Sequence, residues 1–319
     1  MSAPLTQIAI TGASGHVGRY ITEALLASNK AGTKSITALT RAGSTSTLPE
    51  GVKRVEVDYA SKSSLTSALA GVQFLIITLA VTAPPATHSL IVQAAAEAKV
   101  PYVMPNIWGN DICNESLAAE DLYSAGSLKL CREIEALPGG HTAYVALLCG
   151  FWFEWSLMLG ESFFGIDLRS RRATLIDDGL TKVCASTWRQ TGRAVAGLLD
   201  LPEDRLKKWR NKGFYVNSFA VSQREILDAV QRVTGTSDED WEIRYQDAGE
   251  RYREGLQELQ NGVRTGFAKA MYTRTFFKDG GGNFAATRGL DNEEIGLAEE
   301  DLDEAVKRAV ELVESGWTP

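Results

Sequence analysis

Three glycines near the start of the chain carry the clearest chemical signal in the sequence. Gly12, Gly15 and Gly18 stand at every third position, directly after the short apolar run of residues 8–10. The residues that follow place apolar side chains at helical spacing, so the glycines lie where a strand turns into a helix. Free backbone N–H groups and the positive end of the helix dipole bind phosphate at such a turn. We therefore predict that this loop binds the pyrophosphate of a dinucleotide.

The three glycines serve different purposes in such a loop. Gly12 permits a tight turn, Gly15 lets the backbone approach the pyrophosphate, and Gly18 lets the new helix pack against the strand. We expect the whole loop to contact the cofactor: Gly12, Ala13, Ser14, Gly15, His16, Val17 and Gly18.

The ends of the next two predicted strands indicate which dinucleotide is bound. Residues 35–40 form the second strand, and Arg41 follows it. An acidic residue there bonds the ribose 2′-hydroxyl of NAD, whereas an arginine suits the 2′-phosphate of NADP. We therefore predict NADPH or NADP as the cofactor. Asp58 ends the third strand, where it either approaches the adenine amino group or only begins a turn, and the sequence leaves both interpretations open.

The fourth predicted strand, residues 74–79, is continuously apolar and therefore buried on both faces. Its end, Thr78, Leu79 and Ala80, should lie beside the bound dinucleotide, because ligands bind at the carboxyl edge of such sheets.

The fifth and sixth strands end in residues that can contact a cofactor or a substrate. Asn106, Trp108 and Asp111 follow the fifth strand. We expect Asn106 to contact the cofactor and Trp108 the substrate, although packing explains Trp108 equally well. Gly150 and Phe151 follow the sixth strand and are expected at the cofactor. An aromatic cluster comes next, which forms a substrate pocket, a core between domains, or both. We assign substrate contacts to Trp152, Phe153 and Trp155.

Strict alternation of strands and helices stops at Gly150. The sequence therefore predicts an α/β fold: a Rossmann-type doubly wound parallel sheet with a smaller α+β C-terminal domain. We expect an NADP-binding domain over residues 1–150 and a substrate-binding domain over residues 151–319, with some C-terminal strands and helices packing back on the first. Ser222 and Glu225 form a capping box that opens a helix in the second half.

The composition of the chain limits the classes of molecule that we expect it to bind. The 319 residues carry a formal net charge of −7, which argues against nucleic acid or an anionic membrane as the main partner. Residues 1–5 run almost directly into the first predicted strand, so we expect no secretory leader, and no apolar run reaches about 18 residues. The cysteines are scattered without metal-ligand spacing at positions 113, 131, 149 and 184. We expect a cytoplasmic monomer or homodimer with reduced thiols, a small-molecule substrate and no metal.

Several motifs together resemble the NmrA-like and isoflavone-reductase-like family of atypical short-chain dehydrogenases. These motifs are Gly12-x-x-Gly15-x-x-Gly18, Arg41, Met104-Pro105-x-x-x-Gly109, Arg132-Glu133-Ile134-Glu135, Phe151-x-x-Glu154, Leu175-Ile176-x-Asp178-Gly179 and Gly192-Arg193-Ala194. The segment over residues 255–289 looks like fungal members, several of which act in secondary metabolism. The resemblance implies NADP(H) bound across the Rossmann domain. One branch of the family reduces aromatic or heterocyclic metabolites, and another binds NADP(H) as a signal.

The sequence departs from this family at one catalytic position. The reductases usually carry a lysine on the helix after the fifth strand, and alignment on Ile134 places Ser127 there. The Tyr-x-x-x-Lys pattern of ordinary short-chain dehydrogenases leads from Tyr123 to the same serine. Lys129 lies two residues further, about 200° around the helix, and should point away from the cofactor.

Three hypotheses follow. The first is an NADPH-dependent reductase of a C=N, C=C or C=O bond, in which Tyr123, Asp111, Glu154 or water supplies any proton and Ser127 contacts the ribose. An iminium substrate suits this site, because reducing a cation needs no proton at the accepting carbon. The second is a regulator that senses NADP(H) without turnover. The third is a cyclase or isomerase with bound NADPH. We favour the first, because the aromatic cluster suggests a flat organic ligand.

Overall fold

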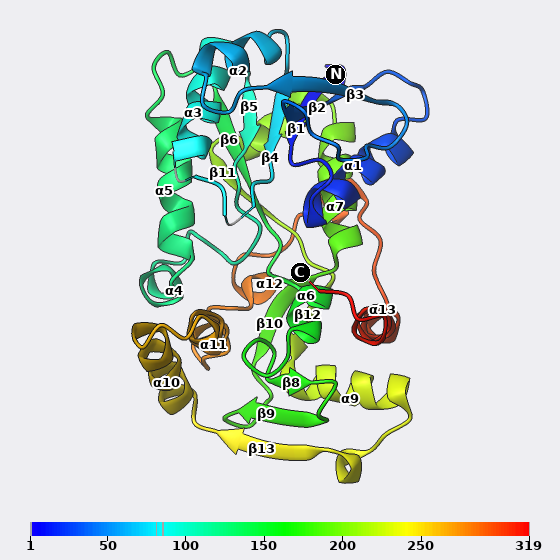
Figure 1. Cartoon of the computed structure of the whole chain (residues 1–319), viewed down its shortest axis with the longest axis vertical. Helices are drawn as coiled ribbons and strands as arrows, with labels where there is room; N and C mark the ends of the chain where they lie inside the picture. Colours follow the sequence, from blue (N-terminus) through cyan, green and yellow to red (C-terminus); the bar gives the residue numbers. More distant parts are fainter. Residues whose placement is uncertain (1, 81, 85, 319) are drawn as a thin grey trace.

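The largest sheet of the molecule has seven parallel strands and lies in the upper half of Figure 1. The computed structural model describes residues 2–80, 82–84 and 86–318. The strand order is β11-β6-β5-β4-β1-β2-β3, which reverses direction between β1 and β4. This arrangement confirms the predicted Rossmann-type fold. The strands are β1 (Gln7–Thr11), β2 (Ser35–Arg41), β3 (Val52–Val57), β4 (Phe74–Ile77), β5 (Tyr102–Met104), β6 (Ala143–Leu148) and β11 (Lys212–Tyr215).

Helices cover both faces of this sheet, so its strands are apolar on both sides. In β6, Val145 and Leu147 face one core, whereas Ala146 and Leu148 face the other. The first core lies under α1 (His16–Ser28) and α7 (Trp188–Asp200). The second lies under α2 (Lys62–Ala68), α3 (Ala86–Glu97) and α5 (Ser124–Glu135), and α4 (Glu115–Glu120) precedes α5. We call the sheet with these helices the Rossmann body.

A second group of elements, which we call the C-terminal body, contains two three-stranded sheets, β12-β10-β7 and β13-β9-β8. Its strands are β7 (Phe151–Trp152), β8 (Ile166–Asp167), β9 (Arg172–Ile176), β10 (Lys182–Ser186), β12 (Phe219–Ser222) and β13 (Glu242–Gln246). Its helices are α6 (Phe153–Met158), α9 (Gln223–Thr234), α10 (Ala248–Gln260), α11 (Thr265–Thr275), α12 (Phe284–Thr287) and α13 (Leu302–Glu314). Short helices α8 (Glu203–Leu206), η1 (Lys207–Trp209), η2 (Asp238–Asp240) and η3 (Glu293–Ile295) complete the chain.

The chain passes between the two bodies more than once. After β10 it returns to the Rossmann body, where α7 packs against α1 so closely that a Cβ at Gly192 would lie 2.3 Å from the Tyr20 carbonyl oxygen. Strand β11 then adds to the sheet beside β6, with Lys212 opposite Val145. In the described residues, no helix has the length and the apolar character needed to cross a bilayer.

Candidate functional site

The glycine loop joins β1 to α1 in a conformation that two of its glycines make possible. Gly12 has a φ of +65°, and a Cβ there would lie 2.0 Å from the Thr78 carbonyl oxygen. A Cβ at Gly18 would lie equally close to the Gly12 carbonyl oxygen, at 2.0 Å. The Gly15 N–H donates to this same carbonyl oxygen at 2.8 Å, and α1 begins at the next residue. The loop therefore wraps tightly around the N-terminus of α1, as phosphate binding requires.

A pocket of about 930 Å³ opens beside this loop, at the carboxyl ends of β1, β2, β3 and β4. This is the switch point of the sheet, where the strand order reverses. The structure brings eight of the predicted cofactor residues together in its wall: Gly12, Ala13, Ser14, Arg41, Asp58, Thr78, Leu79 and Ala80. Arg41 and Asp58 are exposed at the ends of their strands.

Other residues of this pocket were not predicted. Thr40, Ser46, Leu48 and Tyr59 also line it. The Tyr59 hydroxyl donates to the Leu39 carbonyl oxygen at 2.8 Å, and burial raises the pKa of Tyr59 to about 12. Thr40 is next to Arg41 in the sequence and Tyr59 is next to Asp58. Their positions at the ends of predicted strands were therefore a signal that could have identified both residues.

The rest of the loop lies outside the pocket wall. The side chain of Val17 is 4% exposed and packs in the core, so any contact of this residue with the cofactor would come from its backbone. The His16 ring is exposed and stands 5.6 Å from the ring of Trp155 and 5.1 Å from that of Trp317. Partial burial and the nearby charge of Arg19 lower the pKa of His16.

Asn106 links the ends of β4 and β5. Its side-chain oxygen accepts from the Leu79 N–H at 3.0 Å and from Trp108 Nε1 at 3.2 Å. Trp108 is 9% exposed and also donates to the Ile77 carbonyl oxygen. The indole of Trp108 is therefore part of the core, which corrects its assignment to the substrate and agrees with the packing interpretation.

Two residues predicted at the cofactor instead pack in the C-terminal body. A Cβ at Gly150 would lie 2.1 Å from the Cys184 carbonyl oxygen, so the close approach at this glycine is to β10. Phe151 stacks on Tyr272 with ring centroids 3.8 Å apart. These contacts correct both assignments, because sequence position alone does not reveal that β7 turns into a second sheet.

The aromatic cluster divides between the core and the seam of the two bodies. Phe153 is fully buried against Phe164 and Phe219, which corrects its assignment to the substrate. Trp152 and Trp155 are only partly buried, and their rings meet edge to face at 6.2 Å. Trp152 directly precedes α6 and Trp155 lies within it, and both side chains pack against the core of the Rossmann body.

The two carboxylates predicted as proton donors are already engaged. Asp111 is 1% exposed and accepts from the Tyr215 hydroxyl and from Arg288 Nε, each at 2.9 Å. Glu154 accepts from the Trp188 N–H at 3.1 Å at the start of α7, and burial raises its pKa. Both carboxylates are therefore engaged by other protein groups, and their role as general acids stays a prediction.

Tyr123 and Ser127 lie one turn apart at the start of α5. The Tyr123 hydroxyl oxygen accepts from the Trp108 N–H at 3.1 Å, and burial raises the pKa of Tyr123. Ser127 is 5% exposed on the inner face of α5, whereas Lys129 is exposed. Ser127 thus lies on the inner face of the helix and Lys129 on its outer face, as their spacing in the sequence predicts. Tyr123 is thus the phenol nearest in sequence to the position where the reductases place their lysine.

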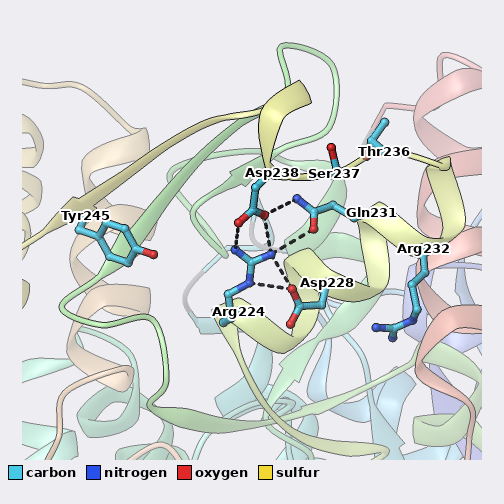
Figure 2. Close-up of a pocket in the computed structure, with 8 residues that line it drawn as sticks. All are labelled: Arg224, Asp228, Gln231, Arg232, Thr236, Ser237, Asp238 and Tyr245. Atoms are coloured by element: carbon cyan, nitrogen blue, oxygen red, sulfur yellow. Dashed lines mark hydrogen bonds and ion pairs between the residues drawn. The ribbon is translucent and has the colours of Figure 1, made fainter.

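A second hollow, of about 740 Å³, lies on the surface of the C-terminal body (Figure 2). Figure 2 shows that its central guanidinium, on Arg224, is held by Asp228, Asp238 and Gln231. Asp228 and Asp238 pair with Arg224, and Asp303 pairs with Arg232, the other arginine of the hollow, so both cations are already engaged. The glycine-loop pocket remains the candidate site.

A doubly wound parallel sheet with a glycine-loop pocket at its switch point is the architecture of Rossmann-type dinucleotide-binding proteins. Residues 5–136 match the NmrA-like family. Oxidoreductase aprR from Aspergillus flavus is 26% identical over 304 residues, which cover 94% of this chain and 97% of that protein. These matches confirm the resemblance to the NmrA-like and isoflavone-reductase-like family that the sequence motifs indicated.

Two solved structures share this fold over nearly their whole length. AtPrR2 with NADP+ and (+)pinoresinol superposes with a TM-score of 0.73 at 16% identity, covering 96% of this chain and 99% of that one. An isoflavone reductase superposes with a TM-score of 0.72 at 19% identity, covering 95% and 99%. At these identities the likeness establishes the fold.

Proposed function

We propose that the chain is a cytoplasmic NADPH-dependent reductase of a small aromatic or heterocyclic metabolite, in fungal secondary metabolism. The observation that carries the proposal is the switch-point pocket, in which the glycine loop, Arg41 and the end of β4 meet. The relative from Aspergillus flavus is named an oxidoreductase, and the AtPrR2 structure contains NADP+. The resemblance to fungal members of the family supports the metabolic setting.

The residues of the pocket suit this cofactor. Gly12 allows the loop to lie against the Thr78 carbonyl oxygen, which a Cβ would approach to 2.0 Å, and the first N–H groups of α1 are available to a pyrophosphate. The exposed guanidinium of Arg41 suits a 2′-phosphate, and Asp58 suits the adenine end. When bound, NADPH supplies a hydride. The chain's own residues bind, orient and shield the reactants.

The engaged carboxylates favour a substrate that needs no proton. Asp111 and Glu154 are both held by other groups, and Ser127 replaces a lysine. An iminium carbon accepts a hydride and becomes a neutral amine, so no protein group has to protonate it. The absence of a lysine charge at position 127 also avoids repulsion of a cation. We therefore infer a conjugated iminium as the preferred substrate. A C=C or C=O substrate would depend on Tyr123 for its proton.

The test measures hydride transfer directly. The purified chain is mixed with C4-deuterated NADPH and one of four acceptors: a cyclic aromatic iminium salt, a quinone, an enone or an aromatic ketone. We expect deuterium on the iminium carbon and the fastest turnover with that acceptor. Gly15→Val, which blocks the pyrophosphate site, serves as the matched inactive control. Faster reduction of the enone or ketone would disprove the iminium preference.

A second candidate is a sensor that binds NADP(H) without turnover. The observation that favours it is the same engagement of Asp111 and Glu154, together with the serine at position 127. Tight NADPH binding without deuterium transfer to any of the four acceptors, together with a protein partner recovered in pull-downs, would favour the sensor over the reductase.

A further inference from the structure

The loop between β2 and β3 has a defined, hydrogen-bonded conformation at the edge of the pocket. The Ser44 N–H donates to the Arg41 carbonyl oxygen at 3.1 Å, which closes a turn in which Gly43 has a φ of +69°. A positive φ at this position of a turn suits glycine. The hydroxyls of Ser44 and Ser46 then lie 3.0 Å apart, and both serines line the pocket beside Arg41. The loop thus presents two hydroxyls and one guanidinium at the same edge of the pocket.

Arg54 holds this loop from behind. It lies on β3 opposite Ala38 of β2, and its guanidinium donates to two loop carbonyl oxygens. Nη1 donates to the Ser44 carbonyl oxygen at 3.2 Å, and Nη2 donates to that of Ser46. Arg54 is not one of the described residues that line the pocket. Arg54 therefore acts on the loop backbone rather than on a ligand.

Thr40 provides an independent sign that a ligand belongs at this edge. Its hydroxyl is buried and has no hydrogen-bond partner among the described residues, although the residue lines the pocket next to Arg41. A buried hydroxyl without a partner costs free energy. Together with the serine hydroxyls and the Arg41 guanidinium, it forms a set of donors. A phosphate monoester, with several acceptor oxygens and two negative charges, matches such a set.

We propose that Arg54 is a positioning residue that sets the preference for NADPH over NADH. By fixing the carbonyls of Ser44 and Ser46, it directs their hydroxyls toward the 2′-phosphate beside Arg41 and Thr40. The planar guanidinium spans both carbonyls at once, whereas a lysine ammonium is a point charge on a flexible stem. This inference rests on the proposed function, since it concerns the cofactor of the same site.

The experiment compares two probes that differ only in the 2′-phosphate: adenosine 2′,5′-bisphosphate and AMP. Calorimetry measures both affinities for the wild type, Arg54→Ala and Arg54→Lys. We expect both variants to bind the bisphosphate about five- to tenfold more weakly, as expected for loss of positioned charge-assisted hydrogen bonds, and AMP within about twofold of wild type. Lys53→Ala is the matched control, because it removes an exposed charge from the neighbouring position of β3 and should change neither affinity.

Each outcome separates the two proposals. Equal affinity of the wild type for both probes would overturn the proposed NADPH function. A wild-type preference for the bisphosphate that survives in Arg54→Ala, or is fully retained by Arg54→Lys, would overturn only the role of Arg54. If Arg54→Ala does not fold, the double variant Ser44→Ala and Ser46→Ala replaces it. Retention of the preference in that variant would likewise overturn the inference.

Discussion

Gly18 on α1 lies directly against Gly12 of the preceding loop, so that a Cβ at Gly18 would stand 2.0 Å from the Gly12 carbonyl oxygen. Backbone atoms on both sides cannot yield as a flexible side chain can. We expect Gly18→Ala to lower the free energy of unfolding by roughly 1–3 kcal/mol, the usual cost of overpacking. Chemical denaturation measures this change. Gly15→Ala is the control, since its Cβ would lie 3.1 Å from the same oxygen and should cost less free energy of unfolding than Gly18→Ala. Equal stability of the two variants would contradict the close approach.

Gly15→Val tests ligand binding rather than folding. Gly15 caps α1 with a φ of −73°, a value that valine also adopts, and the residue is exposed. The branched side chain would project where a pyrophosphate must approach. We expect a folded protein, by circular dichroism, that no longer binds NADPH in calorimetry. Unchanged NADPH affinity would show that the dinucleotide binds elsewhere.

Arg41→Ala tests the choice of cofactor. The exposed guanidinium at the end of β2 would make a charge-assisted contact with a 2′-phosphate, and such contacts contribute roughly 1.5–3 kcal/mol. We expect NADPH affinity to fall by about tenfold or more while NADH affinity stays the same. Fluorescence titration with both cofactors gives the two dissociation constants. A loss that is equal for NADPH and NADH would disprove the assignment.

Three variants on α5 test the missing lysine. Ser127→Ala should change turnover by less than about tenfold, because serine is not a general acid at this position. Lys129→Ala should be silent, because Lys129 is exposed on the outer face of the helix. With an iminium substrate, Ser127→Lys should lower turnover by charge repulsion. Steady-state rates with NADPH check all three, and a large loss in Lys129→Ala would contradict the helical phase.

Acid stability should depend on His88 of α3. His88 is 5% exposed and lies 3.5 Å from Glu133 of α5, yet burial lowers its pKa despite that carboxylate. The unfolded chain binds a proton at its usual pKa of about 6.5, so the folded state loses stability as pH falls below that value. We expect the free energy of unfolding to fall between about pH 7 and pH 5, in the range of histidine titration.

His88→Leu should flatten this pH dependence, while His141→Leu, at an exposed position, should leave it unchanged. Denaturation at a series of pH values measures both slopes. His16 also has a lowered pKa but is exposed, so its contribution should be smaller. The same steep slope in His88→Leu as in wild type would contradict the assignment.

Local patterns were sufficient to predict the first six strands and the glycine loop. Strands β1, β4, β5 and β6 are short apolar runs, and β3 alternates apolar with charged residues. Gly12 and Gly18 are required by the backbone next to them. The capping box of α9 was equally local, and the structure confirms that Ser222 and Glu225 bond each other's backbone N–H groups. Such features depend on residues close in sequence, where spacing is informative.

The site contacts that the sequence did not reveal join distant segments of the chain. Asp111 looked like a free carboxylate at a strand end, but Arg288, far along the chain, binds it. Glu154 is likewise engaged by the N-terminus of α7. Arg54 carried no signal at all, because its partners are backbone carbonyls whose position depends on the fold of the loop. A single sequence does not reveal such partners.

The path of the chain through β11 sets an order for folding on the ribosome. Strand β6 is complete at Leu148, but its neighbour β11 ends only at Tyr215, after β7, α6, β8, β9 and β10 of the C-terminal body have been synthesised. Until then the nascent sheet has an open edge at β6, and α1 lacks its cover from α7. Exposed strand edges and uncovered apolar faces promote association between chains. The growing polypeptide is therefore prone to association with other chains until residues 188–215 have been added and complete the Rossmann body.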